Sequence, residues 1–131
     1  DYFKVVKNCG TDLTPCFASS YKTLNGKTFT LLTPINVVSL ASGAAISVVG
    51  NSLYYSYDYH GYLQLQVDVN GQQGPNILGR DLFYVELYSD GKVAENYNSG
   101  DDWHADYCGD DFNYGFGCLT KIMRDGWKMD Y

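Results

Sequence analysis

Basic residues are scarce in this chain of 131 residues. Nine Lys and Arg stand against fifteen Asp and Glu, so the formal net charge is -6 at pH 7. A protein that follows a nucleic-acid backbone needs clustered Lys and Arg to neutralise phosphates, and the sequence has no such cluster. This composition excludes nucleic acid as a partner. Acidity of this size is more consistent with solubility than with one particular ligand.

Long apolar runs are also missing. No stretch approaches the roughly 20 apolar residues of a membrane-spanning helix, and no signal peptide is present. If the protein is exported, we expect the exporting segment to lie upstream of the first residue. Charged residues make up only 18% and apolar residues 45% of the chain, which argues against disorder. Because linkers, repeats and low-complexity tracts are absent, we predict one domain over residues 1–131.

Motifs that carry catalysis are absent as well. The sequence contains no G-x-S-x-G nucleophile elbow, no H-E-x-x-H zinc pair and no phosphate loop. His60 lies in a Tyr-rich turn without a nucleophile nearby, and His104 precedes Cys108 by four residues. A cysteine in a disulfide cannot act as a nucleophile, so this Cys–His pair requires a free thiol. We therefore expect that the protein is not an enzyme.

Four cysteines are the clearest positive feature. Cys9 and Cys16 lie near the start of the chain, and Cys108 and Cys118 lie near its end. An even number of cysteines at short local spacings is typical of disulfides in an oxidising compartment, whereas zinc sites usually use C-x2-C clusters. Of the three pairings that four cysteines permit, the local one is favoured, Cys9–Cys16 with Cys108–Cys118. Each bridge then closes a loop of roughly ten residues and contributes about 2–3 kcal/mol. Zinc ligands and free thiols are the alternatives.

Most of the remaining pattern predicts β-structure. The clearest strand covers 62–69, where Leu63, Leu65 and Val67 alternate with Gln64, Gln66 and Asp68. This alternation predicts an antiparallel sheet with the leucine face in the core and the glutamine face in water. Further strands are predicted over 27–33, 36–40, 44–49, 53–57, 82–88 and 127–131, with a turn at 50–51 and a long irregular loop over 94–117.

Two helices are predicted beside these strands. Phe3 and Val6 recur at helical spacing, Lys7 suits a helix C-terminus, and Gly10 occupies the position of a C′ residue. Residues 1–9 are therefore expected to be the last turns of a truncated helix. A second, short helix is expected over 118–124, ending near Gly126.

The segments LASGAAIS at 40–47, VDVNGQQGPNILGRDLF at 67–83 and CLTKIMRDGWKMDY at 118–131 resemble parts of bacterial prepilin-type proteins, the subunits of type IV pili and of type II secretion pseudopili. In these proteins a strand ending Asp-x-Asn-Gly leads through Gly-Pro-Asn and Gly-x-Asp into the next strand, as in VDVNGQQGPNILGRDLF at 67–83. Their usual ending, a Cys before an apolar segment and then Asp-Gly-Trp-Lys and an aromatic residue, is similar to 118–131. The segment 40–47 resembles a third, in which a strand follows a Gly turn. Together the matches span roughly the last two-thirds of the chain.

The resemblance implies an α+β fold in which the truncated N-terminal helix packs on an antiparallel sheet of about four or more strands, with a disulfide-closed loop near the C-terminus. It implies a structural subunit, major or minor, of an extracellular or periplasmic filament at the cell surface. The expected partners are other pilin subunits in a helical filament, and the inner membrane through the missing part of the N-terminal helix. The family's apolar N-terminal helix is not in this sequence.

Asp68, Asn70 and Asp81 form a candidate metal site. Carboxylate and amide oxygens on a loop suit calcium, and some pilin-like domains hold calcium in such loops. An EF-hand is excluded, because its sixth and twelfth positions would be Gln73 and Gly79. The alternative is that these side chains cap backbone groups in a tight connection. A second acidic group, at 101, 102, 106, 110 and 111, is interpreted as solvated loop residues.

Aromatic residues supply the last candidate site. The chain has thirteen Tyr, and several crowd two regions together with a Trp. The predicted binding surface comprises Tyr55, Tyr57, Tyr59, Trp103 and Tyr107. Aromatic faces beside Asp and Asn suit sugar sites, and they suit subunit contacts equally. The alternative function is therefore a secreted adhesin or carbohydrate-binding module with a Tyr-rich surface.

Overall fold

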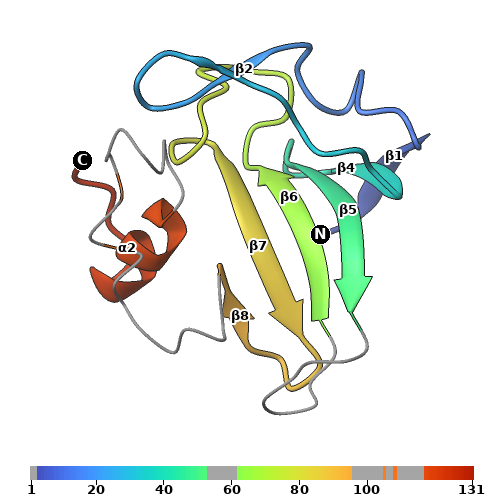
Figure 1. Ribbon diagram of the computed structural model, residues 1–131. Helices are drawn as coiled ribbons and strands as arrows, with labels where there is room; N and C mark the ends of the chain where they lie inside the picture. The colour runs from blue at the N-terminus through green and yellow to red at the C-terminus, as the bar shows by residue number, and fades with distance from the viewer. Residues whose placement is uncertain (1–2, 53–61, 96–104, 106–107, 109–116) are drawn as a thin grey trace.

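The computed structural model describes residues 3–52, 62–95, 105, 108 and 117–131 (Figure 1). Within this part of the chain, a main antiparallel sheet has the strand order β1-β4-β5-β6-β7-β8, and β2 pairs with β3 in a separate small sheet. The strands are β1 Val5–Gly10, β2 Tyr21–Lys22, β3 Thr28–Phe29, β4 Asn36–Leu40, β5 Ala45–Ser52, β6 Tyr62–Asp68, β7 Leu82–Tyr88 and β8 Val93–Ala94. The helix α2 spans Cys118–Arg124.

The N-terminal segment corrects the predicted fold class. The α+β expectation, with a helix stub at residues 1–9 on the sheet, is wrong, because the described chain is mostly β and Val5–Gly10 forms the edge strand β1. β1 runs antiparallel to β4, with Val5 opposite Leu40 and two irregularities in the register. Two helical turns at most could not offset the cost of helix nucleation. The β-branched Val5 and Val6 favour a strand, and β4 supplies its backbone partners.

The antiparallel sheet itself confirms several predictions. β4, β7 and α2 have the predicted bounds, and β6 ends one residue earlier than predicted. The predicted turn at 50–51 is wrong, because β5 continues to Ser52 through a bulge between Val48 and Gly50. The predicted final strand at 127–131 is also wrong. That segment instead folds back, so that the Tyr131 hydroxyl donates to the Gly79 carbonyl.

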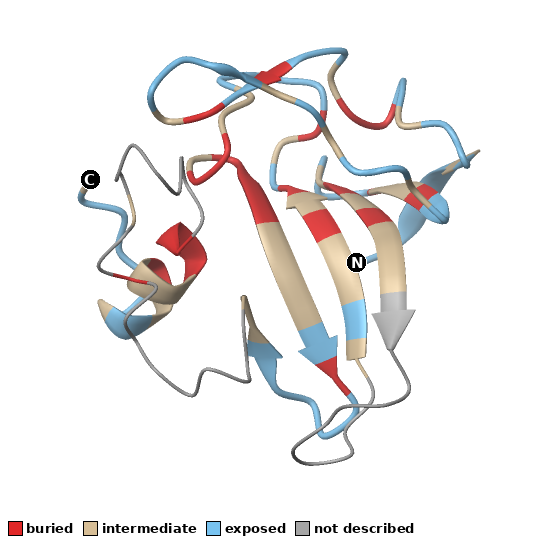
Figure 2. Ribbon diagram, viewed as in Figure 1, coloured by how far each residue is buried: buried red, intermediate tan, exposed pale blue. Residues whose placement is uncertain are grey.

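A layer formed by residues 12–33 covers one face of the main sheet, which we call the covered face. Phe17 and Tyr21 from this layer pack on Val37, Ala45 and Leu82 of the sheet. The buried segments gather where the ends of β5, β6 and β7 meet the β2 loops (Figure 2). This layer reverses the prediction for β6, because Gln66 and Asp68 on the covered face are only 2% and 0% exposed.

Polar side chains are buried on the covered face because they bond to the layer above them. The Gln66 side-chain amide accepts from Leu32 N at 2.8 Å and donates to Leu32 O at 3.3 Å. It therefore pairs with the backbone of Leu32 as a neighbouring strand would. Burial without such partners would cost about 1–3 kcal/mol per group. The buried Gln66 amide and Asp68 carboxylate of the sheet thus both bond to this layer, the carboxylate through the Tyr21 hydroxyl.

Helix α2 packs on the opposite face, beside β7 (Figure 1). Leu119 and Ile122 are buried against Phe83. The helix has no side-chain cap from its own Gly117 position. Instead Glu95 accepts from Gly117 N at 2.8 Å and from Thr120 N at 2.6 Å, and so satisfies two of the amides at this helix start from another segment.

Two disulfides hold the ends of the described chain. Cys9–Cys16 joins β1 to the loop layer across a separation of seven residues, and Cys108–Cys118 anchors the start of α2 across ten. The favoured local pairing is therefore present, and none of the described cysteines is free. Disulfides are typical of proteins in oxidising compartments.

Candidate functional site

The connection between β6 and β7 contains the predicted metal residues, and two buried carboxylates organise it. Asp68, at the end of β6, is fully buried. Its Oδ2 accepts from the Tyr21 hydroxyl at 2.5 Å and its Oδ1 accepts from Asn70 N at 3.0 Å. Tyr21 also accepts from Ala18 N at 3.2 Å, so its hydroxyl links the loop layer to the sheet.

Asp81, just before β7, closes the other end of this connection. Its two oxygens accept from Asn76 N and Ile77 N, both at 2.7 Å. Asn76 has φ 60, a left-handed conformation that asparagine tolerates better than most residues. The Asp81 carboxylate thus satisfies two backbone amides of the turn at 76–77.

Gly71 shows why the Asn-Gly step of this connection requires glycine. It has φ +66, and a Cβ built there would lie 2.7 Å from the Gly43 carbonyl oxygen and 3.4 Å from that of Cys16. No side chain fits at 2.7 Å from a backbone oxygen. The connection therefore packs directly on the disulfide loop and on the β4–β5 turn.

The electrostatics of this site follow from burial. Desolvation raises the pKa of the Asp68 carboxyl above its ordinary value, and the charge of Asp81 raises it further. The hydrogen bonds from Tyr21 and from Asn70 N lower it part of the way back. Burial also raises the pKa of the Tyr21 hydroxyl, and its bond to Asp68 adds to that rise, so this tyrosine stays protonated as a donor.

The arrangement supports the capping interpretation of Asp68 and Asp81, because all four carboxylate oxygens accept hydrogen bonds. In the part of the chain that the structure describes, no group of three or more His, Cys, Asp or Glu is placed to hold a metal. Asn70 Oδ1 and Asn76 Oδ1, however, are buried without a hydrogen-bond partner. Calcium binding at Asp68, Asn70 and Asp81 therefore stays a prediction. Asn76 Oδ1 is a further candidate ligand, which the sequence did not suggest.

The other predicted site residues lie outside the described residues. These are Tyr55, Tyr57, Tyr59, Trp103 and Tyr107, together with His60, His104 and the acidic group at 101, 102, 106, 110 and 111. Cys108 is described, and it is bonded to Cys118. A disulfide sulfur carries no thiolate, so the Cys–His pair has no nucleophile in this state.

The sheet presents a second feature, which we call the aliphatic face. On the side opposite the covered face, Val38, Ile46 and Val67 stand in one cross-strand row, and Val48 and Leu65 stand in the next. All five are partly exposed, and none belongs to either described core cluster. A third row contains Leu63, Leu87 and Val93, which are 39%, 37% and 38% exposed.

The aliphatic face is also uncharged over β4, β5 and β6. β4 and β5 contain no Asp, Glu, Lys or Arg, and the only such residue of β6 is Asp68, on the covered face. α2 covers only the part of this side near β7, where Phe83 and Val85 pack against it. Large contiguous apolar patches on the surface of soluble proteins mark interaction sites.

Sequence reasoning missed Tyr21 and Glu95, two of the side chains that tie distant segments together. Tyr21 was only one of thirteen tyrosines in the sequence. Its partner Asp68 is 47 positions away, and Glu95 lies 22 positions from Gly117. No local pattern signals such pairs.

The described residues contain no helix that is long and apolar enough to cross a membrane. Comparison of the chain with protein-family models, with curated proteins and with solved structures finds no match.

Proposed function

We propose that this domain is a structural subunit, major or minor, of an extracellular or periplasmic filament of the type IV pilus or type II secretion class. The observation that carries the proposal is the aliphatic face. Leu63, Leu87 and Val93 form an exposed row at its edge, and the uncharged rows of β4, β5 and β6 continue from it. A subunit that packs among copies of itself buries such a face, whereas in a freely dissolved monomer the face stays in contact with water.

The resemblance to prepilin-type proteins gives further support, now on residues 40–47, 67–83 and 118–131 and not on the N-terminal strand. The last two segments contact each other, because Tyr131 donates to the Gly79 carbonyl and the Arg80 guanidinium lies 4.8 Å from the Tyr131 ring centroid. Segments that resemble one family in sequence order thus also meet in space.

The proposal is tested first in the cells that produce the protein. Antibodies against the purified domain are used for immunogold electron microscopy of surface filaments. Label along filaments supports a major subunit, and label confined to tips supports a minor one. Protein found only as dispersed monomer in the medium, with no labelled filament, would contradict the proposal and favour a secreted module.

A crosslinking experiment then tests the aliphatic face itself. Leu63 is replaced by the photoreactive residue benzoylphenylalanine in the producing cells, and Thr33, an exposed residue of the loop layer, is replaced in the same way as the matched control. We expect crosslinked dimers and higher species from position 63 and few from position 33. Equal yields at the two positions would remove the aliphatic face from the argument.

A further inference from the structure

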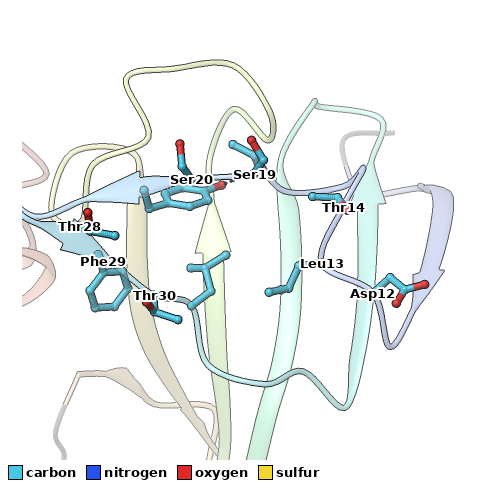
Figure 3. Close-up of a pocket in the computed structure, with 11 residues that line it drawn as sticks. Asp12, Leu13, Thr14, Ser19, Ser20, Thr28, Phe29 and Thr30 are labelled. Carbon is cyan, nitrogen blue, oxygen red and sulfur yellow. Dashed lines mark hydrogen bonds between the residues drawn. The ribbon is translucent and has the colours of Figure 1, made fainter.

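A groove lies between the disulfide loop and the β2–β3 sheet, and none of its lining residues belongs to the aliphatic face. It has a volume of about 430 Å³, which falls within the range of about 300–1,000 Å³ for small-molecule sites. Its two walls come from residues 12–21 and 28–31 (Figure 3).

The floor of the groove is apolar and anchored. Leu13, Phe29 and Leu31 line it and pack at the same time against the buried cluster around Phe17. In Figure 3, Leu13 reaches in from one wall and Phe29 lies across from it. Because these side chains are already held by the core, binding of a ligand costs little of their conformational entropy.

Hydroxyl groups surround this floor. They belong to Thr14, Ser19, Ser20, Thr28 and Thr30, and Ser19, Ser20 and Thr14 follow one rim of the groove (Figure 3). All five residues are exposed, and none of the described hydrogen bonds occupies their hydroxyls. Each hydroxyl can both donate and accept, so the rim suits a ligand that itself carries many hydroxyls.

The charges of the lining exclude other ligands. Asp12 is its only acidic residue and it contains no Lys, Arg or His, so an anionic ligand would meet repulsion without a counter-charge. A purely apolar ligand would bury the rim hydroxyls without partners, at a cost for each. A neutral sugar presents C–H groups that can pack on the apolar floor. Its hydroxyls can bond to the hydroxyls of the rim and can donate hydrogen bonds to the Asp12 carboxylate.

Both walls are fixed before any ligand arrives. Cys9–Cys16 closes the first wall, and Phe17 N donates to Leu13 O at 2.8 Å within it. The second wall pairs Tyr21 with Phe29 across β2 and β3, and Tyr21 is bonded to Asp68 of the main sheet. A preformed groove loses little conformational freedom on binding.

We infer that this groove binds one or two residues of an uncharged saccharide, with Phe29 and Leu13 beneath the sugar ring and the hydroxyl rim and Asp12 around it. The inference does not depend on the filament proposal, because a filament subunit and a secreted module can both carry such a groove.

Nuclear magnetic resonance of the full ¹⁵N-labelled chain tests the inference with three neutral probes, namely lactose, maltotriose and N,N′-diacetylchitobiose. Each is titrated to about 10 mM, which detects a dissociation constant near 1 mM. We expect at least one probe to shift the amide signals of residues 12–14, 18–20 and 28–31. If none of the three shifts these signals, or if the shifts lie elsewhere on the chain, the inference is overturned.

Variants locate the binding. Thr30→Arg fills the groove, and Thr33→Arg places the same side chain at an exposed position three residues along, outside the lining. We expect Thr30→Arg to weaken binding at least tenfold and Thr33→Arg to leave it unchanged; equal binding by both overturns the inference. If Thr30→Arg lowers the melting temperature, Ser19→Lys on the opposite rim replaces it. With 3′-sialyllactose we expect weaker binding than with lactose, and tighter binding of the anionic sugar also contradicts the assignment.

Discussion

Tyr21 is the residue whose loss tests most directly how the loop layer is held on the sheet. In Tyr21→Phe the ring stays and one oxygen is removed. That oxygen donates to the buried Asp68 carboxylate at 2.5 Å and accepts from Ala18 N at 3.2 Å. A hydrogen bond to a charged group contributes about 1.5–3 kcal/mol, and an unpaired buried amide costs about 1–3 kcal/mol. We expect the free energy of unfolding to fall by about 3 kcal/mol.

The size of this loss depends on pH. Burial raises the pKa of Asp68 above 3.8, and the Tyr21 hydroxyl lowers it part of the way back. Removing the hydroxyl therefore raises the native-state pKa further. A carboxyl that holds its proton more tightly in the native than in the unfolded chain makes stability fall as the pH rises through this window. The free energy of unfolding of the variant therefore falls more with rising pH than that of the parent, and the difference between the two free energies grows from acid to neutral pH.

Urea denaturation of both proteins across this pH range, with the disulfides intact, measures the difference. Tyr131→Phe is the matched control, because its hydroxyl donates to the neutral Gly79 carbonyl and its loss should cost about 1 kcal/mol with no acid dependence. A loss for Tyr21→Phe that is no larger than the control, or that stays constant with pH, would refute the view that a buried charged hydrogen bond fastens the layer.

Three further outcomes are expected. Glu95→Ala removes the cap of α2 and should lower the free energy of unfolding by about 1–2 kcal/mol in urea, whereas the exposed Asp130→Ala should change it little; equal effects would contradict the capping role. Burial raises the pKa of Tyr131 to about 12, so the parent should lose stability between pH 10 and 12, and Tyr131→Phe should lose less over that range; identical alkaline profiles would argue against its burial. Calcium at a hundredfold excess over its dissociation constant should stabilise the native chain by about 2.7 kcal/mol by pairing with the buried Asn70 and Asn76 oxygens, and a melting temperature that is the same in calcium and in chelator would remove the metal site.

The sequence predicted local elements well where turn residues and alternation agree. β4, β7 and α2 have the expected bounds, and the two disulfides pair as the spacing favours. These features depend on residues within about ten positions of one another. The helix expected at residues 1–9 failed because its signal, Phe3, Val6 and Gly10, is only one or two turns long. In so short a segment, pairing with β4 outweighs local spacing.

The candidate site was predicted in its parts but not in its connections. Asp68, Asn70 and Asp81 do gather in one connection, as their shared segment suggested, and the capping role weighed for them is the one that their hydrogen bonds support. One side chain that fastens the connection to the loop layer is Tyr21, which no spacing rule associates with Asp68. The groove was missed because its two walls are brought together by strand pairing in the folded chain, of Tyr21 with Phe29 and of Lys22 with Thr28.

The reversal of the β6 faces follows from the same limit. Alternation shows which residues share a face of a strand, but it cannot show what covers that face. Gln66 and Asp68 look like solvent-facing residues in the sequence, but the loop layer covers both and bonds to them through the Leu32 backbone amide and the Tyr21 hydroxyl. Once the polar side is buried, the leucines and valines of the other side become the exposed ones, and Leu63 is 39% exposed while Gln66 is 2% exposed. A strand that places its amides inward and its aliphatic side chains outward gains nothing from water on that second side, so the reversal supports the proposal that another subunit covers the aliphatic face.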